Sequence, residues 1–300
     1  MSRLFGLGAC VLDTLIVCKE YPREDTKLRA EKVFRSGGGP VGNALTVAAK
    51  LGLSSAVIGV FPENQDGAYL LSDFEKNSVD THCAVTVKGA AAFTSFIVLS
   101  ESAGTRTCVF DRGTVPDDPK RLDFSSFRAG DILHLDGNFL QSAIAAAQAA
   151  KQAGALVSID AGGLYDGIGT LLPYADILIP SKEFALGFTG EKDAASAILR
   201  LKKMFSPRVL ALTDGANGGL YLDGDKVLRF DPVPVHAVDT NGAGDTFHGA
   251  FLAAYAEGRT VAQCCDYAAA VAAYKCMHSG VRTFPLDRDN IQRFLASRKG

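Results

Sequence analysis

Apolar and polar residues follow two different periods along this chain. From residue 131 onward, short apolar runs alternate with longer segments in which apolar residues recur every three or four positions. This alternation is typical of strand–helix units, whose strands form a parallel sheet covered by helices on both faces. We therefore expect an α/β fold with strands at 132–135, 156–160, 177–179 and 209–212, and helices at 141–153, 194–204, 245–257, 261–277 and 287–297.

The first third of the chain combines this pattern with an inserted hairpin. An apolar strand is expected at 4–10, ending near Asp13, followed by a helix at 41–51. Residues 93–99 and 106–110 are two β-rich runs joined by the polar turn 100–105, which favours a hairpin over a strand–helix unit. We expect a small sheet that stands off the main body.

Composition excludes several classes of function. The formal net charge is −2 over 300 residues, and no basic run is interleaved with aromatic residues, so we expect neither a nucleic acid nor a membrane as partner. No apolar run is long enough to span a bilayer. The seven cysteines are an odd number and contain no C-x-x-C pair, which indicates reduced thiols in a cytoplasmic protein.

The most informative stretch is the sequence from Asp239 to Phe247, DTNGAGDTF. It predicts the end of a strand, a glycine turn and the start of a helix. Backbone N–H groups at a helix start have no partner inside the helix, and the helix dipole adds positive charge there, so this turn is a natural anion pocket. Asp245 lies beside the pocket, and we interpret it as a base next to a reacting phosphate. The alternative is a routine acidic residue in a first helical turn.

Other candidates lie near the predicted strand ends. Ligands of open α/β sheets bind at the carboxyl ends of the strands, which favours Asp13, Asp160, Thr213 and Asp239. Taken alone, an aspartate at the position of Asp13 is more often a residue of a surface turn. The glycines at 37–39 precede a helix that carries Asn43, and they could form either a ligand loop or a flexible turn. No G-x-x-x-x-G-K-[ST] motif occurs, so a P-loop is excluded, and the third glycine of a dinucleotide fingerprint is missing after Gly6 and Gly8.

At this point the chain resembles the PfkB or ribokinase-like carbohydrate kinases from end to end. The stretch from Asp239 to Phe247 matches the C-terminal signature of that family, and Gly38 and Gly39 with Asn43 and the sequence AAKLG at 48–52 resemble its N-terminal signature. The resemblance implies a ribokinase-like three-layer fold and one kinase domain over 1–300. It also implies a β lid formed from about 13–36 and 85–113, often used for dimerisation, so a homodimer is expected.

The resemblance assigns a role to each matching residue. Asp245 is implied to be the catalytic base, and Gly242, Ala243 and Gly244 the anion hole for the transferring phosphoryl group. Substrate hydroxyls are implied to bind to Asp13, Gly38, Gly39 and Asn43. Thr213 and Gly215 match the nucleotide-binding element together with Gly242 and Gly244, and Asp239 and Thr240 resemble a loop that binds a monovalent cation. The implied ligands are ATP, Mg²⁺ and K⁺.

One departure concerns the magnesium ion. The family usually carries Asn-x-x-Glu after the strand at 176–179, whereas this chain has Ser181 and Phe184 at those two positions. The tail 269–285 and the sequence FHG at 247–249 resemble the corresponding segments of a subgroup near ketohexokinases and sulfofructose kinases. This resemblance favours a ketose, a hexose or a modified sugar as the acceptor of the phosphoryl group. Two alternatives stay open, a nucleoside kinase on the same fold and a non-catalytic sugar-binding regulator.

Overall fold

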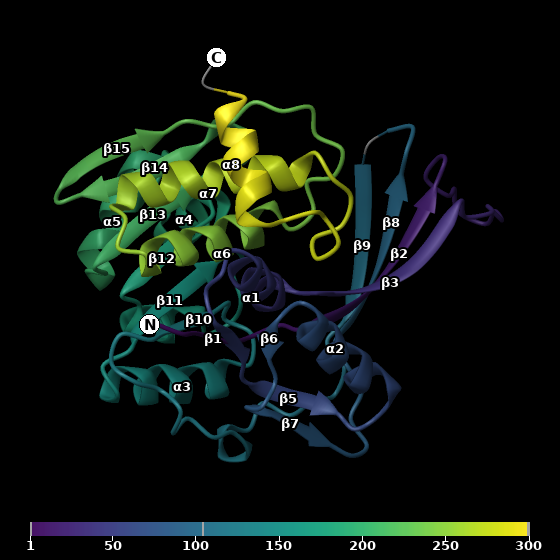
Figure 1. Cartoon of the computed structure of the whole chain (residues 1–300), viewed down its shortest axis with the longest axis horizontal. Coiled ribbons are helices and arrows are strands. Elements are labelled where there is room, and N and C mark those ends of the chain that lie inside the picture. Colours follow the sequence, from purple (N-terminus) through teal and green to yellow (C-terminus); the bar gives the residue numbers. More distant parts are fainter. Residues whose placement is uncertain (1, 104, 299–300) are drawn as a thin grey trace.

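The centre of the molecule is a mainly parallel sheet, which the computed structural model describes together with the rest of residues 2–103 and 105–298. In these residues the sheet is nine-stranded (Figure 1). Its order is β15 (Lys226–Phe230), β14 (Gly219–Asp223), β13 (Val209–Thr213), β12 (Ile177–Pro180), β11 (Leu156–Ala161), β10 (Ile132–Leu135), β1 (Leu4–Leu7), β4 (Ser55–Val57) and β6 (Val79–Asp80). All neighbouring pairs from β13 to β6 are parallel, and β14 and β15 add an antiparallel edge.

Helices cover both faces of this sheet and divide the core in two. Neighbouring strand residues point to opposite faces, so Leu4 of β1 belongs to one hydrophobic cluster and Phe5 to the other. The first cluster receives side chains from α1 (Pro40–Lys50), α2 (Gln65–Lys76), α6 (Ala243–Ala256), α7 (Val261–Cys276) and α8 (Arg288–Ala296). The second receives them from α3 (Leu140–Gln152), α4 (Lys182–Thr189) and α5 (Ala194–Phe205). The predicted α/β class with helices on both faces is confirmed.

A second sheet stands off one side of the body (Figure 1). It has the order β3 (Lys32–Gly38), β2 (Val11–Cys18), β8 (Thr94–Ser100) and β9 (Thr105–Asp111). The expected hairpin corresponds to β8 and β9, which pair antiparallel. The turn predicted at 100–105 includes residue 104, which lies outside the described residues. We refer to these four strands as the outer sheet; that it acts as a lid on a single kinase domain stays a prediction.

Three boundaries differ from the expectation. The apolar run at 4–10 ends as strand β1 at Leu7, and a new strand, β2, begins at Val11 in the outer sheet. Asp13 therefore lies within β2 and not in a turn after the first strand. The outer sheet also extends beyond the expected range 13–36, because β3 ends at Gly38. In the expected lid segment 85–113, β7 (Ala84–Val87) does not join the outer sheet and pairs with β5 (Gly59–Pro62). A continuous apolar run carries no local signal for a change of sheet, which explains the first error.

Among the helices that the structure describes, none is both long and apolar enough to cross a bilayer.

Candidate active site

The start of α6 provides a turn of exposed backbone donors. Gly242 precedes the helix in the left-handed conformation, with φ = 69°, which disfavours a residue with a side chain. A Cβ at this position would also lie only 2.5 Å from Val281 Cγ2, so there is no space for a side chain. A Cβ on Gly244 would meet nothing within 4 Å, so open space faces this residue. In the described parts of the chain, the N–H groups of Gly242 and Gly244 have no acceptor, whereas that of Ala243 donates to Thr240 O at 3.3 Å. The turn is therefore suited to receive an anion.

Asp245 lies in the first turn of α6 and contacts a residue from the other half of the chain. Asn43 Nδ2, in α1, donates to Asp245 Oδ2 at 2.7 Å. Burial raises the pKa of Asp245, and the charge of Asp160 raises it further, while the Asn43 hydrogen bond and His248 lower it. A partly buried carboxylate with a raised pKa is a better proton acceptor than an exposed one.

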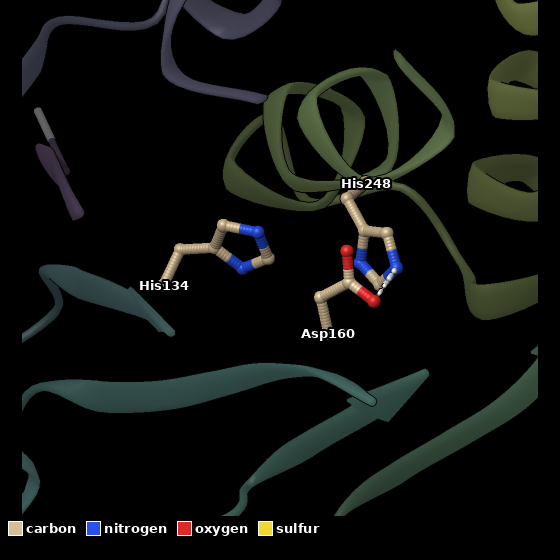
Figure 2. A group of neighbouring side chains, drawn as sticks. All are labelled: His134, Asp160 and His248. Carbon is tan, nitrogen blue, oxygen red and sulfur yellow. Dashed lines mark ion pairs between the residues drawn. The ribbon is translucent and has the colours of Figure 1, made fainter. Parts of the chain in front are cut away.

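Between α6 and the central sheet lies a cluster of three buried side chains, two of which affect the pKa of Asp245. Figure 2 shows His134 from β10 and Asp160 from β11 with His248 from α6. His248 Nε2 lies 3.3 Å from Asp160 Oδ1, and His134 Nδ1 lies 3.2 Å from Ser158 Oγ. Burial lowers the pKa of His134 to about 3, so this imidazole is neutral at pH 7. Their ligating atoms lie within 4.8 Å of one another, a set that could hold a metal ion, although His248 Nε2 and Asp160 Oδ1 already contact each other directly.

On the other side of Asp245, Asp13 projects from the outer sheet. Ser95 Oγ of β8 donates to Asp13 Oδ1 at 2.6 Å, and burial raises the pKa of Asp13 to about 6. A Cβ on Gly38 would lie 1.9 Å from Asp13 Oδ2, so only glycine allows the carboxylate to occupy this place. Gly39 has φ = 86°, and a Cβ there would lie 2.2 Å from Ala9 O. These two glycines thus shape the site by allowing close packing.

Two cavities meet at the start of α6. The first, of about 440 Å³, is bounded by the outer sheet and contains most of the predicted substrate residues and the whole predicted anion hole. Among the side chains and loop residues that line it are Asp13, Gly39, Asn43, Arg106, Arg112, Asn138, Tyr165 and residues 240–245. Gly38 lies behind Asp13 and not in the lining. The volume is in the range of small-molecule sites.

The second cavity, of about 460 Å³, lies on the other side of the same loop. It is mostly apolar, with Val233, Val235 and Phe247 among its lining residues, and it also contains Thr213 and Gly215. Both cavities include Thr240, Ala243 and Gly244. The glycine turn therefore separates this apolar cavity from the first one, which has a mixed lining with several charged and amide side chains and which we call the polar cavity.

Arg282 is a buried residue that holds Asn43 in the wall of the polar cavity. Its side chain is 1% exposed, and Nε donates to Asn43 Oδ1 at 3.1 Å while Nη2 donates to Gly38 O at 2.8 Å. Nη1 forms an ion pair with Asp73 of α2. Because Asn43 Oδ1 accepts from Arg282, the amide must turn its Nδ2 toward Asp245. Arg282 thus orients the residue that contacts the predicted base.

Comparison with known proteins decides the family. The model of the pfkB family carbohydrate kinases matches residues 1–288. The chain belongs to this family. Its members are ATP-dependent phosphotransferases that act on sugar hydroxyls, and this pfkB-family kinase is an enzyme of that class.

Three relatives illustrate the match of sequence and fold. The kinase is 26% identical to mouse (Mus musculus) ketohexokinase over 92% of this chain and 96% of that protein. Its fold is similar to that of the ribokinase of Thermotoga maritima, with a TM-score of 0.85 and 20% identity over 99% of this chain and 100% of the other. The ribokinase of Arabidopsis thaliana complexed with ribose and ATP gives a TM-score of 0.81 and 24% identity, over 98% and 99% of the two chains. The ribokinase-like fold is confirmed.

The two residues that depart from the family pattern have structural roles in this pfkB-family kinase. Ser181 caps the N-terminus of α4, where its Oγ accepts a hydrogen bond from Phe184 N at 3.1 Å. Phe184 is 1% exposed and stacks on Phe188 in the core. Glu183, the neighbouring carboxylate, is exposed. Neither of the two positions therefore offers a carboxylate for magnesium.

The predicted site residues form one continuous region, but their roles stay predictions. Several residues of the region were missed from the sequence, among them Asn138, Arg106, Arg112, Arg282 and Lys275. Asn138 follows β10, so the rule of strand ends could have found it. Arg106 lies in β9, Arg112 directly follows this strand, and Lys275 and Arg282 lie near the C-terminus, and no local pattern marks any of the four.

Proposed function

We propose that this kinase transfers the γ-phosphate of ATP to a sugar hydroxyl, with Asp245 as general base. The observation that carries the proposal is the position of the glycine turn, which separates an apolar cavity from a polar one and carries Asp245 next to Asn43 on the polar side. ATP then occupies the apolar cavity with Thr213 and Gly215, and the sugar occupies the polar cavity. The triphosphate reaches the sugar across Gly242, Ala243 and Gly244.

The chemistry follows from this placement. Asp245 accepts the proton of the attacking hydroxyl, whose oxygen forms a bond to the γ-phosphorus as the bond to the bridging oxygen of ADP breaks. The free N–H groups of Gly242 and Gly244 stabilise the negative charge on the transferring phosphoryl group. The raised pKa of Asp245 makes the carboxylate a stronger base once it is ionised.

The polar cavity suits an acceptor with several hydroxyl groups. Asp13 accepts hydrogen bonds, and Asn138 adds a further polar group. Arg106 and Arg112 also line this cavity and donate to the neutral groups Thr240 Oγ1 and Asn138 Oδ1 at 3.2 and 2.7 Å. The two guanidinium groups can donate to the hydroxyl oxygens of a hexose or a ketose, and they can also pair with a charged substituent of a modified sugar.

Mg²⁺ would accompany the ATP, as the family resemblance implies. The side chains at the two expected helper positions do not fit this role, because Ser181 is a helix cap and Phe184 is buried. Mg²⁺ therefore has no assigned protein ligand here, and Asp245 and the glycine turn carry the proposal without one.

Location and assembly are proposals of the same kind. All seven cysteines are free thiols, which supports a reducing compartment and hence the cytoplasm. The outer sheet exposes a group of large apolar side chains, which supports a homodimer through this sheet. They are Val33, Phe96, Val109 and Phe110, each at least half exposed.

The test is a screen of ADP release over hexoses, ketoses, pentoses, sugar phosphates and nucleosides, followed by Asp245→Asn on the best acceptor. Loss of the base lowers kcat by about 100- to 10,000-fold. An asparagine can still accept the Asn43 hydrogen bond, so the fold is expected to be retained. Asp289→Asn, an exposed acid in the first turn of α8, is the matched control and keeps its activity. Near wild-type turnover of Asp245→Asn would refute the proposal.

A further inference from the structure

Lys275 is a completely buried lysine in the last turn of α7. Its side chain is 0% exposed, and its ammonium group donates to Asp239 O at 2.7 Å and lies 3.3 Å from Asp239 Oδ2. A buried charge is very costly unless it is paired and hydrogen-bonded, and here a carbonyl and a carboxylate satisfy it. The ammonium group is thus held by the residue to which the family resemblance assigns a monovalent cation.

The remaining bonds of Asp239 leave little room for an ion. Its Oδ1 accepts a hydrogen bond from Asn241 N at 2.8 Å, and its Oδ2 accepts one from Gly280 N at 2.9 Å. A potassium ion in a protein replaces its hydration shell with oxygen ligands such as carbonyl groups. In this chain the carbonyl oxygen and both carboxylate oxygens of Asp239 already have protein donors. Asp239 therefore does not fit a potassium ion while Lys275 is present.

The same contacts fasten the glycine turn. Val238 N and Asp239 N donate to Cys276 O at 2.7 and 3.1 Å, so the irregular segment before the turn is tied to the end of α7. Gly242, three residues after Asp239, packs directly against Val281. The position of the anion-binding N–H groups thus depends on the junction between Asp239 and the C-terminal end of α7, and Lys275 is the charged group at that junction.

We propose that the ammonium group of Lys275 serves as a built-in monovalent cation of this kinase. It takes the place of potassium at Asp239 and positions the anion hole, so catalysis does not require an added monovalent ion. A lysine ammonium is a compact point charge with three donors, which suits this replacement. Lys275 acts through the loop and is a positioning residue. The inference rests on the proposed function, because the turn must bind the transferring phosphoryl group.

The first measurement uses the wild-type enzyme in choline chloride, NaCl and KCl at equal ionic strength. The rate is expected to be the same in all three salts. A wild-type rate that rises with KCl relative to choline chloride would overturn the proposal, and this result does not depend on any variant. If the enzyme phosphorylates none of the acceptors, the proposed function fails, and the unfolding measurements below still decide whether Lys275 replaces the ion.

Two variants then separate the effect of losing the Lys275 charge from the effect of losing the volume of its side chain. Lys275→Ala removes the charge and opens a cavity, whereas Lys275→Met removes the charge and fills most of the space. In choline chloride both should lose kcat by on the order of tenfold or more, less than the roughly 100- to 1,000-fold of a direct oxyanion donor, with little change in the KM of the sugar. KCl or NH₄Cl should restore Lys275→Ala but not Lys275→Met. Full activity of Lys275→Ala without K⁺, or a loss that neither salt restores in the folded variant, would contradict the proposal.

Thermal unfolding gives a readout besides activity. Lys275→Ala is expected to melt at a lower temperature than wild type in choline chloride and to gain stability selectively with KCl, because an ion that binds only the native state stabilises it. Wild type should show no such selective gain. Lys203→Met, which replaces an exposed lysine in the last turn of α5, is the matched control. A selective gain of wild type with KCl would show that a separate ion is bound and that Lys275 does not replace it.

Discussion

Arg282 offers the most direct test of how the tail of the chain supports the site. Its guanidinium connects three elements, through Asp73 of α2, Gly38 O of β3 and Asn43 of α1. It also lies over the Phe74 ring, with Cζ 4.7 Å from the ring centroid. Arg282→Met keeps much of the apolar volume but removes the charge and all donors. Asp73 then loses its cation, and two buried acceptors lose their hydrogen bonds.

The size of the effect follows from burial. Breaking a buried ion pair by removing one partner costs about 3–5 kcal/mol. For a chain of 300 residues with an unfolding entropy of about 2.1 cal/mol/K per residue, this lowers the melting temperature by about 5–8 °C. Arg200→Met, on the exposed side of α5, is the control and should melt with wild type.

The same variant should change catalysis in a defined direction. Without Arg282, the side-chain amide of Asn43 is free to turn, and Asp245 loses the hydrogen bond that lowers its pKa. The pKa of Asp245 then rises, so the acid limb of kcat/KM moves to higher pH. Thermal denaturation and a pH–rate profile measure both effects. A melting temperature within error of wild type, together with an unshifted acid limb, would refute this account of Arg282.

Two further predictions follow from the pKa shifts at the site. Asp13→Asn should weaken sugar binding yet stabilise the fold at pH 8, because burial raises the pKa of Asp13 from 3.8 to about 6. The folded wild type therefore loses stability as the pH rises through this window, so the advantage of the variant in urea unfolding should vanish below pH 4. An equal advantage at pH 8 and pH 3.5 would contradict this explanation. Asp160→Asn removes a charge that raises the pKa of Asp245. The acid limb of kcat/KM should therefore move to lower pH. A shift to higher pH would contradict this and show that Asp160 acts mainly through His248.

Most strands and helices of the second half were predictable because each carries its own period. The strand end expected at Asp239 was wrong, because residues 231–240 form no strand, and Val238 and Asp239 are held by hydrogen bonds to Cys276 O instead. In the stretch from Asp239 to Phe247, the glycines and the following apolar residues are close neighbours in sequence, and they predict a helix start without any tertiary information. The expected helix at 245–257 is α6, which begins two residues earlier. The region around 4–18 was less predictable, because an apolar run has the same pattern whether it stays in one sheet or crosses into another.

In the candidate site too, some residues could be found from the local sequence and others only from the tertiary structure. The sequence by itself pointed to the glycine turn with Asp245 and to the glycines at 37–39, since these residues stand together in short stretches, and Gly39 and Gly242 adopt positive φ angles that favour glycine. Only the tertiary structure decided which groups support them. Arg282 bonds to Gly38 across 244 positions, and Lys275 bonds to Asp239 across 36. Neither Lys275, in the last turn of α7, nor Arg282, in the segment after it, has a local feature that predicts burial, because each charge is satisfied by partners that folding brings from elsewhere in the chain.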